Sequence, residues 1–362
     1  MKINFKVKLH DFDWLVTIII LLLATFGLFF IHSTTTNTQV CFSKYFYKQL
    51  FGLIFGLFIY LFFYFKKLVS LRRLGYVGFI ITLALLIFTI IKGSVGMGAQ
   101  RWINLGIIKF QPSELAKLFF PAFLVYYLYE NGKEPVFKNI FPLLIIFSVC
   151  LILILKQPDL GTAILVGLGG LILFAYAGLS HKFFISMFFL SIITAPICWK
   201  FLKPYQKKRI EIFLGGGSQH KERYQIEQAK IAIGSGNLWG KGYTQGTQNR
   251  LSFLPEKRTD FIFAIICEEL GFVGALIILF LYLILFVYQL LLIGKMSSWY
   301  DQLLALGLIT PLIGSTIINI AMTTQLAPVV GIPLPFISYG ITNLWISLAA
   351  MGWINNIIAH QK

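Results

Sequence analysis

The feature that most constrains this chain is a series of long apolar runs. A helix needs about 20 apolar residues to cross ~30 Å of hydrocarbon. Ten runs approach that length: 14–31, 47–65, 74–91, 114–130, 139–155, 159–178, 183–201, 260–293, 301–325 and 335–358. The chain is 57% hydrophobic and 12% charged, whereas soluble domains carry about 25% charged residues. We therefore predict an all-α polytopic membrane protein with about ten transmembrane helices, folded as a single integral-membrane domain over residues 1–362. The first run is too long for a cleaved signal peptide, so we expect it to be retained.

The basic residues predict how the helices are oriented. Cytoplasmic loops are enriched in Lys and Arg. Such residues precede the first run and follow the second, fourth, sixth and eighth: Lys2, Lys6, Lys8, Lys66, Lys67, Arg72, Arg73, Lys133, Lys138, Lys182 and Lys295. The short loops on the other side, 31–46 and 325–335, carry only Lys44. We therefore expect both termini on the cytoplasmic side (N-in/C-in).

One long segment, residues 203–259, departs from this charge pattern. It forms a large extracytoplasmic loop between helices 7 and 8, with eleven basic and four acidic residues and hence a net charge of +7. Long loops are translocated largely regardless of charge, so the orientation stands. The charge indicates either binding to anionic lipid headgroups or a site for a phosphate-bearing substrate. Nucleic acid is not an expected partner, because the loop faces away from it.

The same loop shows internal order. Gln228, Ile231 and Ala232 follow helical spacing, and a glycine series comes after them: Gly234, Gly236, Gly240, Gly242 and Gly246. Glycine allows tight turns and close approach of the backbone to a neighbour or a ligand. No Gly-Lys-Ser or Gly-Lys-Thr triplet is present, which excludes a Walker loop.

Charged and polar residues recur where the apolar runs begin. Glu114 and Lys117 lie three apart, on one face of a helix. A charged pair within a span usually faces the bundle interior or a cavity, so it either fixes helix packing or lines a charged cavity. Gln111 and Ser113 are candidates to cap the same helix.

Two further polar segments interrupt the apolar pattern. Pro158 breaks one helix, and Asp159 is expected to cap the next. In 321–340, three prolines interrupt the run, and irregular backbone at membrane depth is tolerated only against protein or a water-filled cavity. The polar segments 101–117, 156–162, 203–260 and 324–340 all map to the outer ends of spans. We therefore predict one outward-facing cavity that accepts a lipid-linked substrate carrying phosphate.

The stretch LPEKRTDFIFAIICEELG, residues 254–271, holds three carboxylates near the start of an apolar run. Asp260 lies where polar loop gives way to apolar helix. On one continuous helix, Glu268 would lie about 80° around the axis and ~12 Å deeper, too far to share a proton with Asp260 but able to line the same cavity. Glu269 would point to the opposite side and pair with another span or reach the inner boundary. We expect both glutamates to be structural.

Several motifs together resemble one family. GAQRWINLG, FQPSELAK, QPDLGTA, QAKIAIGSG, GKGYTQGTQ, LPEKRTDFIFA, EELGFVGA and GIPLPFISYG occur in this order along nearly the whole chain. The sequence resembles the SEDS family (shape, elongation, division, sporulation), and GKGYTQGTQ followed by FLPE is similar to its rod-shape branch, RodA, more than to its division branch, FtsW.

The resemblance implies a multi-pass peptidoglycan glycosyltransferase. Such an enzyme polymerises lipid II on the outer face of the bacterial cytoplasmic membrane during elongation and shape maintenance. It also implies a class B penicillin-binding protein, a transpeptidase, as partner, alongside other membrane proteins of the elongation complex and membrane lipids. The family's catalytic aspartate falls on Asp260, and its polar pair in the fourth span falls on Glu114 and Lys117.

The chemistry of that reaction suits these residues. A sugar hydroxyl attacks an anomeric carbon whose leaving group is a lipid pyrophosphate, and Asp260 can remove the hydroxyl proton as general base. Cations stabilise the departing pyrophosphate; the candidates are Arg101, Lys117, Arg209 and Arg258. Glu114 and Asp159 are expected to line the same substrate site. A divalent cation, Mg²⁺ or Mn²⁺, is a candidate cofactor, but no ligand cluster with metal spacing appears, so the pyrophosphate would hold part of it.

Other functions remain open on the sequence alone. Ten spans with intramembrane charges also suit a lipid II flippase, and a non-catalytic scaffold would not need a carboxylate at position 260. The sequence departs from the family pattern at Gln325 and at Ile341-Thr342-Asn343, which leaves the roles of Ser338 and Thr342 open.

Overall fold

The structure is a computed structural model, and it describes residues 11–35, 42–96, 99–106, 108–130, 137–201, 204–216, 221–251, 253–254 and 256–361. Of the basic residues used for the orientation, Lys2, Lys6, Lys8 and Lys133 lie outside this part of the chain, as does Lys203 of the large loop. The elements in chain order are α1 (Trp14–Thr35), α2 (Lys44–Phe65), α3 (Leu68–Lys92), β1 (Ser94–Gly96), β2 (Ala99–Asn104), β3 (Lys109–Phe110), α4 (Ser113–Glu130), α5 (Phe137–Lys156), α6 (Leu160–Tyr176), α7 (His181–Phe201), α8 (Pro204–Phe213), α9 (Lys221–Ser235), α10 (Thr247–Arg250), α11 (Ile262–Gly294), α12 (Trp299–Thr323) and α13 (Ile341–Ala359).

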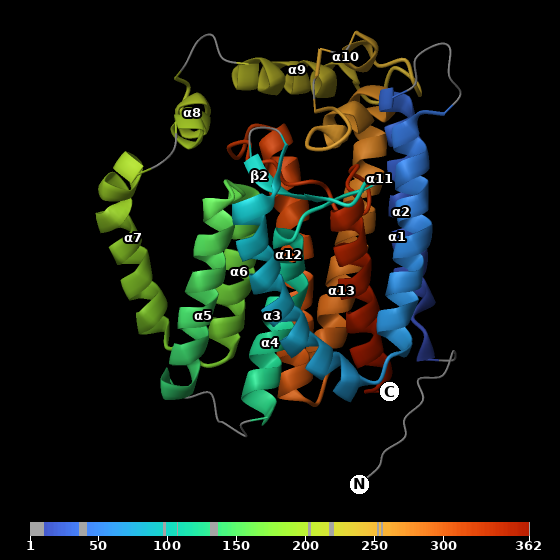
Figure 1. Cartoon of the computed structure of the whole chain (residues 1–362). Helices are drawn as coiled ribbons and strands as arrows, with labels where there is room; N and C mark the ends of the chain where they lie inside the picture. Colours follow the sequence, from blue (N-terminus) through green and yellow to red (C-terminus); the bar gives the residue numbers. More distant parts are fainter. Residues whose placement is uncertain are drawn as a thin grey trace.

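Each predicted apolar run overlaps with a helix, α1 to α7 and α11 to α13. Within the described residues, α1, α2, α3, α11 and α12 are long and apolar enough to cross a membrane, and α5, α6 and α7 contain shorter apolar helices. The chain is therefore a multi-pass membrane protein. Figure 1 shows the long helices running side by side, with α8, α9 and α10 gathered at one end of the bundle. We call this the loop end; α1 begins and α13 finishes at the opposite end.

The prediction of an all-α fold is wrong for one short segment at the loop end. Between α3 and α4 the chain forms a small antiparallel sheet in the order β1-β2-β3. Trp102 and Ile103, residues with high strand propensity, lie in its central strand. The sheet places Arg101 beside the start of α4, and so matters for the site.

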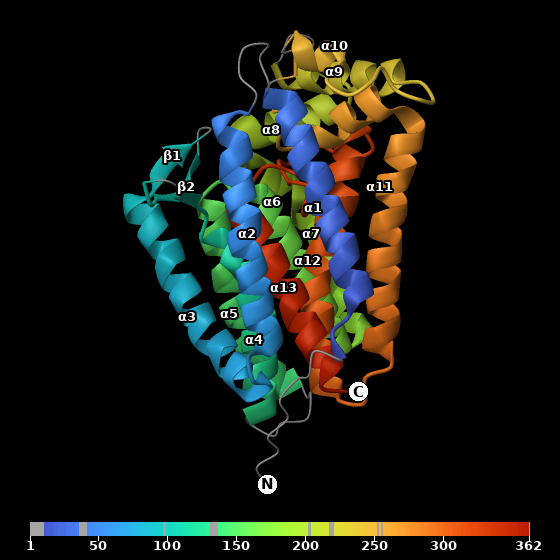
Figure 2. The same cartoon turned by 90° about the vertical axis from the view of Figure 1, so that its right-hand side faces the viewer.

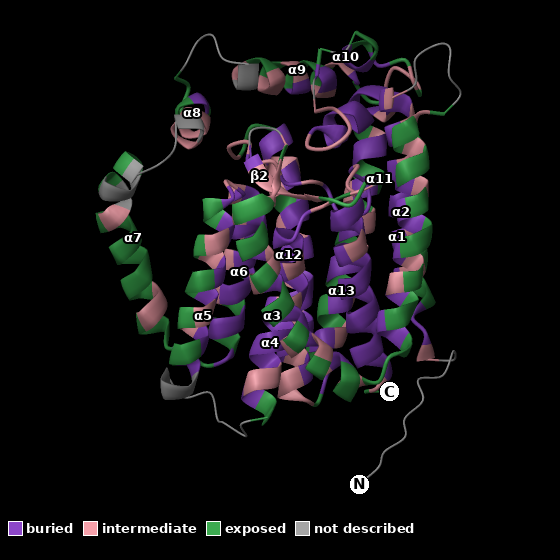
Figure 3. Ribbon diagram, viewed as in Figure 1, coloured by how far each residue is buried: buried purple, intermediate pink, exposed green. Residues whose placement is uncertain are grey.

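The core is built around α13, which is buried along nearly its whole length (Figure 3). Small residues let backbones approach it closely, as is common between membrane helices. A β-carbon added at Gly352 would lie 2.3 Å from the carbonyl oxygen of Tyr60 on α2. A similar contact joins α3 to α4, where a β-carbon at Gly75 would lie 2.3 Å from that of Ala122.

Two predicted spans differ from the helices that form. Residues 324–340 are irregular, as the prolines predicted, so α13 begins only at Ile341 and not at residue 335. In α11 the backbone leaves helical geometry at Gly271, where φ is 69° and ψ is −164°. The prediction of one continuous helix from Asp260 onward is therefore wrong, because a left-handed glycine divides α11 just after Glu269.

We predict that Asn356→Leu destabilises the bundle. The Asn356 side-chain amide donates to the carbonyls of Phe63 (2.9 Å), Lys66 (2.7 Å) and Tyr64, and so satisfies free acceptors at the end of α2. Leucine would leave them buried without a donor, at a cost of about 1–3 kcal/mol. Thermal unfolding in detergent measures this loss. Ser148→Ala, at an exposed hydroxyl that donates to the Leu144 carbonyl of its own helix, is the control, and equal stability of the two variants would contradict the prediction.

Candidate active site

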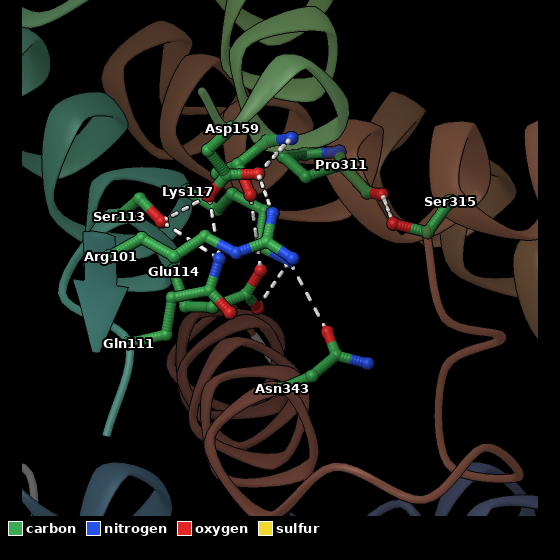
Figure 4. A network of polar contacts seen from close by, with 10 residues as sticks. Arg101, Gln111, Ser113, Glu114, Lys117, Asp159, Pro311, Ser315 and Asn343 are labelled. Atoms are coloured by element: carbon green, nitrogen blue, oxygen red, sulfur yellow. Dashed lines mark hydrogen bonds and ion pairs between the residues drawn. The ribbon is translucent and has the colours of Figure 1, made fainter. Parts of the chain in front are cut away.

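Asp159 is the centre of a polar network at the loop end (Figure 4). Its carboxylate accepts hydrogen bonds from Gln111 Nε2 and Ser113 Oγ, both at 2.6 Å. It also accepts from the backbone N–H of Thr162 at 3.3 Å, which confirms that it caps α6. Arg101 Nη1 lies 3.3 Å from Asp159 Oδ1. Gln111 and Ser113, expected to cap α4, instead donate their side chains to Asp159 and join α4 to α6, while Arg101 joins β2 to the same carboxylate.

Glu114 and Lys117 form the ion pair that their spacing predicts. Lys117 Nζ lies 2.6 Å from Glu114 Oε2, and both side chains are only 6% exposed. Lys117 also donates to Asn343 Oδ1 on α13 at 3.2 Å, and Thr162 Oγ1 lies 3.5 Å from Glu114 Oε1. Asn343 belongs to the segment that departs from the family pattern, and sequence reasoning gave it no role.

Asp260 lies just before α11, and its carboxylate stays open. In the part of the chain that the structure describes, no hydrogen bond or ion pair engages either oxygen. A β-carbon built at Gly331 would lie 3.5 Å from Asp260 Oδ2, so the carboxylate rests against the irregular 324–340 segment. Burial, together with the nearby Glu256 carboxylate, raises the pKa of Asp260 to about 6, while Arg101 and Arg209 partly lower it.

The turn that carries Asp260 is held from the side of α12 and the 324–340 segment. Asn319 Nδ2 donates to the Asp260 carbonyl at 3.0 Å and to the Ile332 carbonyl at 2.7 Å. Ser338 Oγ donates to the Thr259 carbonyl at 2.7 Å. Asn319 and Ser338 therefore position the backbone around Asp260. Sequence reasoning did not assign this role: it left Ser338 open and did not single out Asn319.

The two candidate site arginines of the large loop, Arg209 and Arg258, lie in different surroundings. Arg209, on α8, acts electrostatically on Asp260. The Arg258 guanidinium lies 3.8 Å from the centre of the Tyr45 ring, a cation–π contact, and the Arg258 carbonyl accepts from Tyr339 N at 2.9 Å. The geometry thus brings Arg101, Asp159, Glu114 and Lys117 into one network and Arg209 within electrostatic reach of Asp260, while Arg258 stacks on α2.

Glu268 and Glu269 are structural, as expected, but the large loop covers them. Glu268 Oε1 accepts from Lys241 Nζ (2.8 Å), Thr247 Oγ1 (3.0 Å) and Gln248 N (3.1 Å). Glu269 accepts from three residues: Ser33 Oγ on α1 (2.5 Å), Asn249 Nδ2 (2.9 Å) and Thr244 N (3.1 Å). The prediction that Glu269 pairs with another span is confirmed, whereas a position at the inner boundary is wrong because the loop folds over the start of α11.

The glycine series explains how the large loop packs so closely against α11. A β-carbon at Gly236 would lie 1.9 Å from the Cys267 carbonyl, and one at Gly240 would lie 2.1 Å from the Glu269 carbonyl. At Gly246 it would lie 2.6 Å from Glu268 Oε2. These three glycines therefore permit close packing on α11, and ligand contact is not needed to account for them.

The described residues contain no group of three or more His, Cys, Asp and Glu side chains that could hold a metal ion. The carboxylates of Asp159 and Glu114 are occupied by cations and hydrogen-bond donors, whereas that of Asp260 has no such partner among the described residues. The side chains therefore do not fit a resident divalent ion held by protein alone.

We predict that Lys117→Met destabilises the protein by about 3–5 kcal/mol, because it leaves Glu114 as an unpaired buried charge. The double variant Glu114→Gln/Lys117→Met should recover most of this loss, since it buries no charge. Chemical unfolding in mild detergent compares the two. Equal stability of the single and double variants would show that the pair does not act as a buried ion pair.

Comparisons with known proteins agree with this architecture. The sequence profile of FtsW, RodA and SpoVE, described as cell cycle proteins, matches residues 13–362. The peptidoglycan glycosyltransferase MrdB of Escherichia coli K12 is 41% identical over 286 residues, covering 78% of this chain and 77% of MrdB. The peptidoglycan glycosyltransferase RodA of Treponema pallidum is 30% identical over 431 residues, covering 97% and 98%.

The fold also has a solved counterpart. One chain of a peptidoglycan synthase complex, solved to describe the structural coordination of polymerization and crosslinking, superposes with a TM-score of 0.81. It is 25% identical, and the match covers 97% of this chain and 98% of that one. The matched profile spans the loop-end network, the Asp260 turn and α13 alike. The chain therefore belongs to the FtsW/RodA/SpoVE family, the SEDS family, and within it is RodA-like.

Proposed function

We propose that this protein is a peptidoglycan glycosyltransferase that polymerises lipid II into glycan strands during cell elongation. Its MrdB and RodA relatives are named for this activity. The observation that carries the proposal is the Asp260 carboxylate, which is unpaired among the described residues and has a pKa raised to about 6 beside two arginines. A carboxylate left open next to cations suits a base acting beside an anionic leaving group.

The proposed topology follows from the charge pattern and the helices. All ten long helices cross the bacterial cytoplasmic membrane with both termini inside, in one domain over residues 1–362. The loop end, with 203–259, then faces outward. The sugar and pyrophosphate of a lipid-linked substrate would meet Asp260 there, while the lipid tail stays in the bilayer.

In the proposed reaction, Asp260 accepts the proton of the attacking sugar hydroxyl while that oxygen bonds to the anomeric carbon of the donor. The bond from this carbon to the lipid pyrophosphate breaks, and the pyrophosphate leaves with its negative charge. Asn319 and Ser338 hold the Asp260 turn, so that the base need not reorganise during the step.

Arg101 and Arg209 are the proposed partners of the pyrophosphate, because both act on Asp260 from nearby. Asp159 anchors Arg101 by one terminal nitrogen. Lys117 is buried against Glu114 and Asn343, so we place it, with Glu114 and Asp159, in the wall that supports Arg101. Arg258 would contribute from the side of α2. A divalent cation, Mg²⁺ or Mn²⁺, would enter with the substrate, because its oxygen ligands would come mainly from the pyrophosphate.

The proposed partner is a class B penicillin-binding protein, a transpeptidase that crosslinks the new strands. The solved relative belongs to a complex that coordinates polymerization and crosslinking. Other membrane proteins of the elongation complex would join the same assembly.

We predict that Asp260→Asn lowers polymerisation by roughly 10²- to 10⁴-fold, the usual contribution of a general base. Asparagine keeps the size of the side chain but cannot accept the proton. Purified protein with its transpeptidase partner, given lipid II in vesicles, is assayed for glycan strands on gels. Glu256→Gln is the matched control, because it removes a neighbouring carboxylate that takes no proton in the reaction.

Three outcomes separate the alternatives. Equal product from wild type and a folded Asp260→Asn variant would reject the catalytic assignment. Movement of lipid II across the vesicle membrane without polymer would favour a flippase. If neither wild type nor any variant makes polymer or transports lipid II, but the protein still stimulates its transpeptidase partner, the result would favour a scaffold.

We predict that polymerisation falls as the pH drops through about 6. Because the pKa of Asp260 is raised, the base is ionised above that value and becomes protonated below it. Glu256 is one cause of the raised pKa, so Glu256→Gln should shift the acidic limb of the kcat/KM profile to lower pH. An unchanged limb in Glu256→Gln would mean that another group controls the profile.

A further inference from the structure

Two apolar side chains of the large loop stand out from its surface. Leu238 is 61% exposed and Trp239 is 78% exposed. They lie on a turn whose flanking residues, Asn237 and Gly240, take left-handed φ angles of 48° and 79°. A turn of this kind has a defined shape, so the two side chains are presented together.

The turn is fastened to α11 at the point where that helix kinks. The N–H of Phe272 donates to the Asn237 carbonyl at 2.9 Å, and the N–H of Val273 donates to the Leu238 carbonyl at 3.2 Å. A β-carbon at Gly271 would lie 2.3 Å from Gly240 N, which leaves no space between loop and helix. Figure 2 shows α9, which leads into the turn, lying across the loop end of the bundle.

Below the turn, α11 presents an exposed apolar stripe. Phe272, Leu276, Phe280 and Leu283 are 56%, 46%, 61% and 58% exposed, and their spacing of four, four and three residues places them on one face. In a membrane-spanning helix, an exposed face of this kind meets lipid. The turn therefore continues the lipid-facing surface of α11 at its loop end.

We propose that the Leu238–Trp239 turn is a membrane anchor that inserts into the lipid headgroup region of the leaflet at the loop end. Tryptophan is enriched at this depth because its ring is apolar and its N–H needs a polar partner. Leu238 adds apolar area beside it. Lys230, exposed on α9, adds a positive charge on the same element, as anionic headgroups favour.

The anchor leads directly to the segment that covers the two glutamates. Lys241, Thr247 and Gln248 follow the turn and bind Glu268. Asn249 binds Glu269, and its carbonyl accepts from Lys257 Nζ at 2.5 Å, three residues before Asp260. The turn thereby sets the height of the Asp260 segment relative to the lipid surface. This consequence rests on the proposed function, whereas the anchor itself does not.

Depth-dependent fluorescence quenching tests the anchor. The protein is reconstituted in vesicles that contain lipids spin-labelled either near the headgroup or near the end of the acyl chain. The Trp239 signal is the difference between wild type and Trp239→Phe. We expect the shallow label to quench this signal more than the deep label. No quenching by either label, or stronger quenching by the deep label, would overturn the proposal.

A second pair of variants guards against local misfolding of Trp239→Phe. Leu238→Asp should speed amide hydrogen exchange over residues 241–250 in vesicles, because a carboxylate removes apolar area that favours insertion and is repelled by anionic headgroups. Leu251→Asp, at a side chain that is also 61% exposed but follows α10, should not. Equal exchange in both variants would contradict the anchor. Quenching that disappears once the transpeptidase partner is added would assign the turn to a protein interface instead. None of these readouts requires polymerisation.

Discussion

Three buried carboxylates at the loop end, those of Asp159, Glu268 and Glu269, each accept hydrogen bonds from several donors, and these bonds hold the elements of the site in place. Asp159 joins β2, α4 and α6 through Arg101, Gln111, Ser113 and the Thr162 amide. Glu269 joins α1, α10 and α11. A charge away from water is costly unless it is paired and hydrogen-bonded. Each of these acids therefore requires its donors to stay where they are, and the helices that carry the donors stay with them.

Asp260 differs from these acids in chemistry because it lacks such donors. Asp159 receives a guanidinium and three further hydrogen bonds, so both of its oxygens are occupied. Asp260 has its backbone held by Asn319 and Ser338, but its carboxylate has no such partner among the described residues. Its pKa is raised to about 6 chiefly by burial. A fixed backbone with an open carboxylate is the combination that a general base needs.

The loop and α11 depend on one another. The left-handed Gly271 redirects α11, and Gly236 and Gly240 let the loop lie against the redirected backbone. The loop then supplies Lys241 to Glu268, and Thr244 and Asn249 to Glu269, which also accepts from Ser33 on α1. Glu268 and Glu269 lie just before the kink, so the loop that packs there meets both carboxylates.

Features that depend on neighbouring residues could be read from the sequence. Apolar runs predicted where the helices lie, because helix formation in lipid follows from local apolarity. The Glu114–Lys117 pair and the Asp159 cap follow from spacings of three residues, and Asp260 was identified through a motif that resembles a known family. The tertiary structure alone decided which polar groups meet: Lys117 donates to Asn343, Ser33 donates to Glu269, and Gln111 and Ser113 donate to Asp159. These partners come from segments far apart in the chain, and a carboxylate takes whichever donors the packed helices bring within 3 Å or so. For the same reason, only the fold showed that neither oxygen of Asp260 has a partner among the described residues, whereas Asp159, Glu114 and Glu269 are paired.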